Sequence, residues 1–195
     1  MHLFFSSPVW ASKIDSYDEI NKEILIYLEK LKDLNPKGIT KSNLQGWHSE
    51  NFKLNEDMPK KIISSFKKNI NTALDDMNWN LEKQHAKITS MWAIINKMGA
   101  SNHKHQHGNS DLSAAYYVKA PLDCGDIVFY DPRPAAVFKH PSCKSPNILN
   151  ATVNSIKPEE GLLVLFPSYL EHSVNANLSN QKRIVISFNL SMENN

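Results

Sequence analysis

The stretch Ser101-Asn-His-Lys-His-Gln-His-Gly-Asn-Ser-Asp-Leu-Ser-Ala-Ala-Tyr-Tyr-Val118 carries three histidines at alternate positions, His103, His105 and His107, directly before an apolar and aromatic run. In an extended chain, residues i and i+2 point to the same face, so two or three of these imidazoles would converge on one spot. Imidazole is the commonest protein ligand for iron, zinc, copper and nickel. The stretch therefore predicts a metal site at the rim of a β-barrel, with a solvated histidine-rich loop as the simpler alternative.

The composition restricts the class of protein. The chain has 195 residues, enough for one domain with a sizeable core. Its formal net charge of +2 gives no strongly basic field, which argues against nucleic acid as a partner. No apolar run is long enough to span a bilayer, and the opening residues lack the features of a signal peptide. With only two cysteines, Cys124 and Cys143, and no disulfide framework, we expect a cytoplasmic protein without membrane association.

Two amphipathic helices precede a series of strands. The first helix begins at Ser16, with Glu19 completing a capping box, and the second is capped by Asn55 or Asp57. From residue 86 onward, roughly seven or eight short strands follow without intervening helices. This order favours an antiparallel sandwich or closed barrel whose outer face is covered by the two helices.

The same pattern indicates one domain over residues 1–195. Residues 1–85 supply an N-terminal strand and the supporting helices, and residues 86–195 form the β core. The N-terminal strand contains Pro8, which suits the edge of a sheet. An exposed edge can pair with a second copy of the chain, so a homodimer is open.

A further histidine, His172, lies far along the chain and is expected to lie near a buried cation, Arg183. His172 follows a buried strand, and the final strand begins at Arg183. If these two strands form a hairpin centred between Asn177 and Leu178, His172 lies opposite Arg183. A buried guanidinium needs an anionic partner, and its fork matches a carboxylate. We therefore expect a protein acid or a bound carboxylate next to the metal.

The last strand alternates in a way that separates its two faces. One face is expected to point into the barrel, and its residues are Arg183, Val185, Ser187 and Asn189. The other face is apolar and consists of Ile184, Ile186 and Phe188. Elsewhere, His48 and His85 have no sequence neighbours suited to a metal site and are expected at the surface or in the core. Trp92 is expected in the core, and so is Trp47, for which a place in a substrate groove is the alternative.

These motifs together resemble those of the iron(II)- and 2-oxoglutarate-dependent oxygenases, over about residues 87–190. The resemblance is to a small phage- and bacteria-associated group with a His-x-His pair and a Ser-x-x-Tyr-Tyr strand, and residues 3–10 also look like that group. The motifs are, in order, His105-Gln-His107-Gly-Asn-Ser, Leu112-Ser-Ala-Ala-Tyr-Tyr-Val118, Asp131-Pro-Arg133, Gly161-Leu-Leu-Val-Leu-Phe-Pro167, His172 and Arg183-Ile-Val-Ile-Ser-Phe-Asn189. Each motif is weak alone, but their order and spacing make the match specific.

The resemblance implies a double-stranded β-helix of the jelly-roll type with Fe(II) in its mouth. It implies that His105, His107 and His172 are the metal ligands and that 2-oxoglutarate is the co-substrate. The residues it implies for the far carboxylate of 2-oxoglutarate are Arg183 first, then Tyr117 and Ser113 on one strand face, with Asn96 as a weaker candidate. The implied activity is a dioxygenase, a hydroxylase in the first instance, that couples 2-oxoglutarate decarboxylation to oxidation of a substrate by O2.

The sequence departs from the better-known pattern at one ligand. The usual facial triad has two histidines and one carboxylate, but position 107 is His. A three-histidine set would bind Zn(II), Ni(II) or Cu(II) as well as Fe(II). Asp111 is a second-ranked source of the missing carboxylate, and His103 is the histidine of the cluster expected to stay outside the metal set. The alternative function is a three-histidine cupin-like metal-binding protein without 2-oxoglutarate, for which an inward Arg183 has no evident use.

Overall fold

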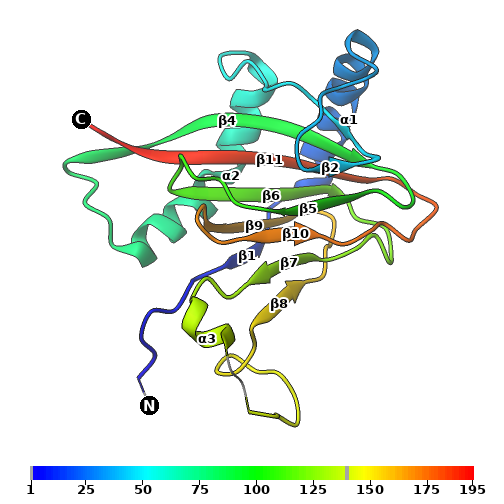
Figure 1. Cartoon of the computed structure of the whole chain (residues 1–195). Coiled ribbons are helices and arrows are strands. Elements are labelled where there is room, and N and C mark those ends of the chain that lie inside the picture. The colour runs from blue at the N-terminus through cyan, green and yellow to red at the C-terminus, as the bar shows by residue number, and fades with distance from the viewer. Residues whose placement is uncertain (1, 139–140) are drawn as a thin grey trace.

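The computed structural model describes residues 2–138 and 141–195. Its elements in these two ranges are β1 (Trp10–Lys13), α1 (Tyr17–Leu34), β2 (Asn43–Leu44), β3 (Trp47–His48), α2 (Asp57–Met77), β4 (Gln84–Asn96), β5 (Ser101–His105), β6 (Leu112–Lys119), β7 (Ile127–Tyr130), α3 (Pro134–Phe138), β8 (Val153–Ile156), β9 (Leu162–Pro167), β10 (His172–Val174) and β11 (Arg183–Asn194). The chain is thus mainly β, with two long helices before the main run of strands (Figure 1).

The strands form two antiparallel sheets. One has six strands in the order β1-β9-β6-β11-β4-β3, and the other has five in the order β2-β5-β10-β7-β8. Most neighbours within each sheet are not consecutive strands, because the chain passes back and forth between the two sheets; the exceptions are β3–β4 and β7–β8. This is the jelly-roll arrangement of a double-stranded β-helix, so the expected fold class is confirmed.

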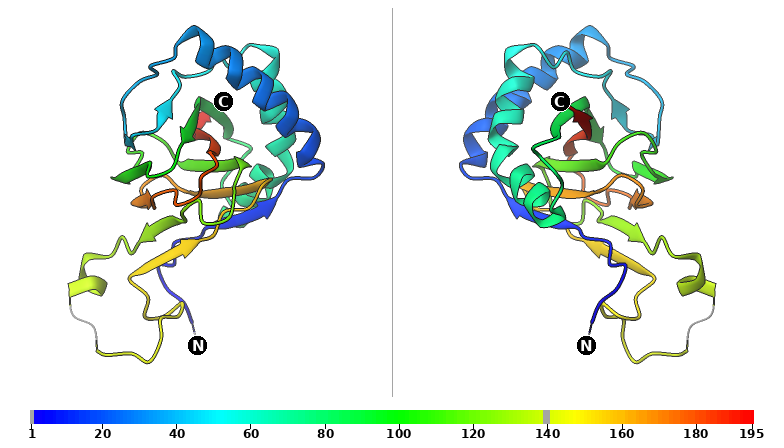
Figure 2. Two further views of the ribbon diagram at one scale, coloured as in Figure 1. Left: turned by 90° about the vertical axis from the view of Figure 1, so that its right-hand side faces the viewer. Right: turned by 90° about the vertical axis from the view of Figure 1, so that its left-hand side faces the viewer.

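Alternation along the strands of the larger sheet separates a helix-packed face from an inner face. On β11, Ile184, Ile186 and Phe188 belong to the core beneath the helices. The apolar stripes of α1 and α2 pack on the same core, with Ile24 and Phe66 fully buried. Figure 2 shows both long helices on one side of the molecule, against the outer face of this sheet. The supporting role predicted for the helices is therefore confirmed.

The start of α1 differs in detail from its sequence pattern. Ser16 occupies the N-cap position with a φ of 51°, and its side chain makes no capping hydrogen bond. The expected capping box is therefore wrong, because it requires an extended N-cap residue whose hydroxyl can reach the third helical N–H. Asp18 and Glu19 still lie in the first turn, where carboxylates favour the positive end of the helix dipole.

The predicted hairpin between the strands of His172 and Arg183 is also wrong. His172 lies in β10 of the five-stranded sheet, where its neighbours across the strand are His105 and Phe129. Arg183 begins β11 of the six-stranded sheet, and its partner there is Asn96. The two residues thus lie in different sheets, facing one cavity from opposite walls.

The reason for this difference is the path of residues 175–182. The backbone N–H of Asn175 donates to the carbonyl of Asp126 at 2.9 Å, and that of Asn177 donates to the carbonyl of Ala100 at 2.9 Å. These distant partners take the hydrogen bonds that a local hairpin would have used, and they carry the chain from one sheet to the other.

No helix in the described residues has both the length and the apolar character needed to cross a membrane.

Candidate active site

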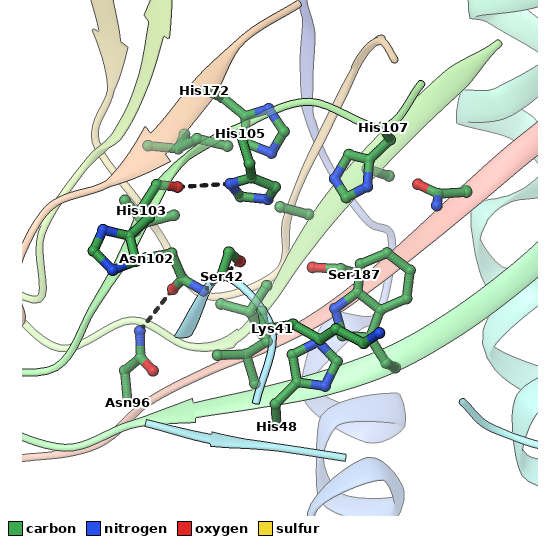
Figure 3. Close-up of a pocket in the computed structure, with 18 of the residues that line it drawn as sticks. Lys41, Ser42, His48, Asn96, Asn102, His103, His105, His107, His172 and Ser187 are labelled. Atoms are coloured by element: carbon green, nitrogen blue, oxygen red, sulfur yellow. Dashed lines mark hydrogen bonds between the residues drawn. The ribbon is translucent and has the colours of Figure 1, made fainter. Parts of the chain in front are cut away.

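A cavity of about 730 Å³ lies between the two sheets. That size is typical of pockets that hold small molecules. The inward residues of β11 predicted from the alternation all line it, which confirms that prediction; they are Arg183, Val185, Ser187 and Asn189. His105, His107 and His172 lie at one end of the cavity (Figure 3).

His105, His107 and His172 can place one ring nitrogen each within 4.8 Å of one another. His105 and His172 are direct neighbours across β5 and β10, with ring centroids 4.3 Å apart. His107 comes just after β5, where its backbone N–H donates to the carbonyl of Ser168 at 2.9 Å. Three imidazoles from two adjacent strands thus converge in a geometry that can hold one metal ion.

Hydrogen bonds orient two of these rings. The Nδ1 atom of His105 donates to the carbonyl of His103 at 2.6 Å, and that of His172 donates to the carbonyl of Leu170 at 3.0 Å. These bonds fix the tautomer and leave each Nε2 lone pair for a metal, as metal-binding histidines require.

Burial keeps the cluster neutral. Burial first, and then the proximity of His105, lowers the pKa of His107 to about 4 and that of His172 to about 3. Burial likewise lowers the pKa of His105. Neutral imidazole is the form that binds metals, so the cluster needs no deprotonation at neutral pH.

The cluster contains no carboxylate among the described residues. Asp111 accepts a hydrogen bond from the backbone N–H of Met192 at 2.7 Å, which directs its carboxylate to β11 instead. His103 lines the cavity but contributes its carbonyl to His105, and its ring is absent from the metal-binding group. Neither alternative source of a ligand is therefore favoured by the geometry.

Arg183 is fully buried on the cavity wall. Its Nη1 atom donates to the carbonyls of Cys124, of Gly125 at 3.0 Å and of Asn175 at 3.1 Å. Gly125 has a φ of 87°, and a Cβ there would lie 2.3 Å from the Asn175 carbonyl, so only glycine allows this cradle. The other terminal nitrogen, Nη2, is buried without any hydrogen-bond partner. A cation in this state, without an ion pair to a described acid, can receive an anionic ligand.

Tyr117 is buried beside Arg183 and also lines the cavity. Burial raises the pKa of its phenol, and the Arg183 charge opposes this only in part. The phenol therefore remains protonated and can donate a hydrogen bond to a bound anion. The backbone N–H of Gly161 donates to the carbonyl of Tyr117 at 2.8 Å, which helps to hold this part of β6 in place.

The other two predicted co-substrate residues lie differently. Ser113 is buried and absent from the cavity wall; its hydroxyl contacts the Ser168 hydroxyl at 2.7 Å and donates to Asn189 at 2.9 Å. Asn96 lines the cavity and donates to Asn102 at 3.0 Å, while its Oδ1 is buried without a partner. Ser113 is thus placed as a tether between strands, and Asn96 as part of the wall.

The sequence did not predict the residues that form one wall of the cavity, which is built by residues 39–51 and is called the outer wall below. His48, assigned to the surface or the core, is 6% exposed yet lines the cavity, as does Trp92. The polar segment that carries His48 also brings Lys41 and Ser42 to the wall. The only local sign of this wall in the sequence is the pair Trp47-His48, which stands in an otherwise polar stretch. Trp47 lies in the core and His85 is exposed, as predicted.

Comparison with known proteins agrees with this geometry. A comparison with proteins of curated function finds no match. The chain is similar in fold to the viral collagen prolyl hydroxylase of Paramecium bursaria Chlorella virus-1 in its 2OG complex, with 16% identity, a TM-score of 0.58 and coverage of 93% of this chain and 95% of that one. The prolyl-4-hydroxylase of Pseudomonas putida matches with 11% identity, a TM-score of 0.62 and coverage of 94% and 93%.

A third solved structure extends the fold comparison. HygX from Streptomyces hygroscopicus, with nickel, 2-oxoglutarate and hygromycin B bound, matches with 8% identity, a TM-score of 0.65 and coverage of 95% of this chain and 83% of that one. A family model described as 2OG-Fe(II) oxygenase matches residues 90–189, just over half of the chain. The chain therefore belongs to the 2OG-Fe(II) oxygenases, enzymes that use Fe(II) and 2-oxoglutarate as co-substrate to oxidise a substrate.

Proposed function

We propose that this oxygenase is a hydroxylase in which His105, His107 and His172 hold Fe(II), and Arg183 with Tyr117 holds the far carboxylate of 2-oxoglutarate. The observation that carries the proposal is the convergence of three neutral imidazoles on a cavity whose wall holds a buried guanidinium with an unpartnered Nη2. Iron bound at this place supplies oxygen activation, which couples decarboxylation of 2-oxoglutarate to oxidation of a substrate C–H bond.

The donor set fits this assignment. The carbonyls of His103 and Leu170 hold two of the rings so that their Nε2 atoms stay free. Arg183 cannot reorient, because its Nη1 is held by three backbone carbonyls, so its Nη2 is presented in a fixed direction. A charge-assisted bond from Nη2, with a hydrogen bond from the Tyr117 phenol, binds the far carboxylate of 2-oxoglutarate.

Apolar side chains also line the cavity. They include Ile127, Val174, Val185 and Phe166, whose ring centroid lies 4.6 Å from that of His172. They keep bulk water from the guanidinium and strengthen its attraction for a carboxylate, since electrostatic interactions grow as the local dielectric falls. The residues of this chain thus bind and orient the co-substrate and keep the reaction dry.

The test is anaerobic titration of the metal-free protein with Fe(II) and 2-oxoglutarate, following the weak visible charge-transfer band. We expect a band that requires both additions, that is lost in His172→Ala, and that in Arg183→Gln appears only at far higher 2-oxoglutarate while metal binding persists. An unchanged 2-oxoglutarate affinity in Arg183→Gln would contradict the assignment of this residue. A band retained in His172→Ala would contradict the proposed ligand set.

We also propose that the protein is a single-domain cytoplasmic enzyme that does not bind nucleic acid, and that two copies form a dimer through β1. The net charge of +2 supports the absence of nucleic-acid binding, and the two free cysteines support a cytoplasmic location. β1 is at the end of the six-stranded sheet, with one edge bonded to β9. Light scattering on a size-exclusion column tests the pairing, and a monomer mass at high concentration would rule it out.

A further inference from the structure

The outer wall of the cavity is formed by the segment that contains β2 and β3. Its lining residues are Ile39, Lys41, Ser42, His48, Glu50 and Asn51. Figure 3 shows Lys41 and His48 together on the wall that faces the three histidines of the metal-binding group. β3 is anchored to the six-stranded sheet by its pairing with β4, in which His48 lies opposite Ile94. The wall is therefore part of the sandwich.

His48 is a buried polar residue held in one orientation. Its Nδ1 atom donates to the carbonyl of Ser49 at 2.6 Å, and its ring stacks on Trp92 with a centroid distance of 5.8 Å and an interplanar angle of 9°. Trp92 in turn lies 5.7 Å from the ring of His107. The remaining nitrogen, Nε2, has no hydrogen-bond partner among the described residues. Because His48 lines the cavity, this acceptor is open to a molecule bound there.

The charges around His48 define what it can accept. Burial, and to a lesser degree the positive charge of Lys41, lowers the pKa of His48, although its bond to the Ser49 carbonyl acts in the opposite direction. The ring is therefore neutral, and its Nε2 accepts a hydrogen bond from an O–H or N–H group. Lys41 forms no ion pair with a described residue and offers a free cation at the same place. Glu50 adds a carboxylate to this wall, bonded only to Asn35 at 3.4 Å.

We infer that Lys41 and His48 bind the substrate that is oxidised, and that this substrate carries a carboxylate with a hydrogen-bond donor on the adjoining carbon, as free α-amino acids and α-hydroxy acids do. The inference rests on the proposed function, because the proposed function places the metal and 2-oxoglutarate at the opposite end of the cavity. Lys41 pairs with the carboxylate, and the Nε2 of His48 accepts from the α-ammonium or α-hydroxyl group. The negative charge of Glu50 favours the ammonium form.

The experiment measures succinate release by the Fe(II)-loaded enzyme in air with 2-oxoglutarate. The probes are the L-amino acids, their α-hydroxy counterparts, and carboxylates and primary amines of matched side chain. We expect members of the first or second set to stimulate succinate release, and the third set not to. Comparison of the first two sets decides which donor the enzyme accepts. Equal stimulation by simple amines or simple carboxylates overturns the inference without any variant.

The variants assign the effect to the two residues. His48→Phe keeps an aromatic ring on Trp92 but removes the acceptor, and it should raise the KM of the active probe roughly tenfold or more, as should Lys41→Met. His48→Gln offers an amide oxygen and should recover part of the loss. His85→Phe and Lys30→Met, outside the cavity, are the matched controls.

Measurement of the visible Fe(II)–2-oxoglutarate band separates the two proposals. If the wild-type protein gives no band, the proposed function fails. If the band forms but no probe stimulates turnover, or if His48→Phe and Lys41→Met keep the wild-type KM, the inference about the substrate is overturned while the proposed function stands. If a variant loses the band, its KM does not bear on substrate binding, and the response of the wild-type enzyme to the three sets of probes decides the inference.

Discussion

The two faces of the six-stranded sheet differ in what they contribute. On β11, Ile184, Ile186 and Phe188 pack under the helices, while the alternate residues Arg183 and Ser187 line the cavity. The helix-packed residues of this strand are apolar, whereas its cavity face holds a buried cation with an unpartnered nitrogen. Stability and binding are therefore carried by alternate residues of one strand, and substitutions on the two faces should have separate consequences.

The largest effect is expected on the cavity side, at the metal-binding group. His172→Ala removes a buried imidazole that lies 4.3 Å from the ring of His105, and it should lower metal affinity by at least about 100-fold and abolish turnover. Titration with Co(II), followed by its visible absorption, measures the affinity. His85→Ala is the matched control, since His85 is exposed and distant in the fold. Equal affinities in the two variants would show that His172 is not a ligand.

The next effect is expected on the helix-packed face. Phe188 is fully buried, with its ring 5.7 Å from that of Phe66 in α2. Phe188→Ala should lower the free energy of unfolding by about 3–5 kcal/mol, because it leaves a cavity in the core. Urea denaturation measures this change. Ser187→Ala, one residue earlier and on the opposite face, should change stability by less than about 0.5 kcal/mol. Similar losses in both variants would remove the distinction between the faces.

This distinction was available from the sequence, and so was part of the site. Alternation along residues 183–189 predicted both faces correctly, because a strand that separates two environments carries a period of two. His105 and His107 were found for the same local reason. The motif order then identified the family and hence the jelly roll, which local patterns alone leave open between a sandwich and a barrel.

The parts that failed depend on long-range pairing. His172 was placed opposite Arg183 because neighbouring strands often form hairpins, but it pairs with His105 in the other sheet. The outer wall was missed because β2 and β3 have two residues each, too few to show a period. His48 therefore looked like an isolated histidine until its pairing with β4 placed it on the cavity wall.

A smaller effect is expected where the two regions meet. The Ser113 hydroxyl contacts the Ser168 hydroxyl and donates to Asn189, so it ties β6 to β11 and to the turn after β9. Ser113→Ala should cost about 1–3 kcal/mol, since it leaves the buried Ser168 hydroxyl without its partner. Urea denaturation measures the loss, and the 2-oxoglutarate KM of the same variant tests its predicted contact with the co-substrate. A wild-type stability would contradict the tether.

The weakest effect expected is a pH dependence of the metal-free protein. The pKa of His172 is lowered to about 3 by burial and by the nearby His105, and burial lowers that of His107 to about 4, whereas both titrate near 6.5 in an unfolded chain. Between these values the unfolded chain binds protons that the folded protein does not, so stability falls as pH decreases from about 6.5 toward 4.

Replacing His172 isolates this contribution from that of other groups. In the presence of a chelator, the loss of stability between pH 7 and pH 5 should be smaller in His172→Asn than in the wild-type protein, because one buried imidazole no longer takes part. His85→Gln should keep the wild-type slope, as its ring is exposed in the folded protein. Equal slopes in all three proteins would mean that water reaches the cluster before a metal binds. The cavity face would then be more open than its burial in the sandwich indicates.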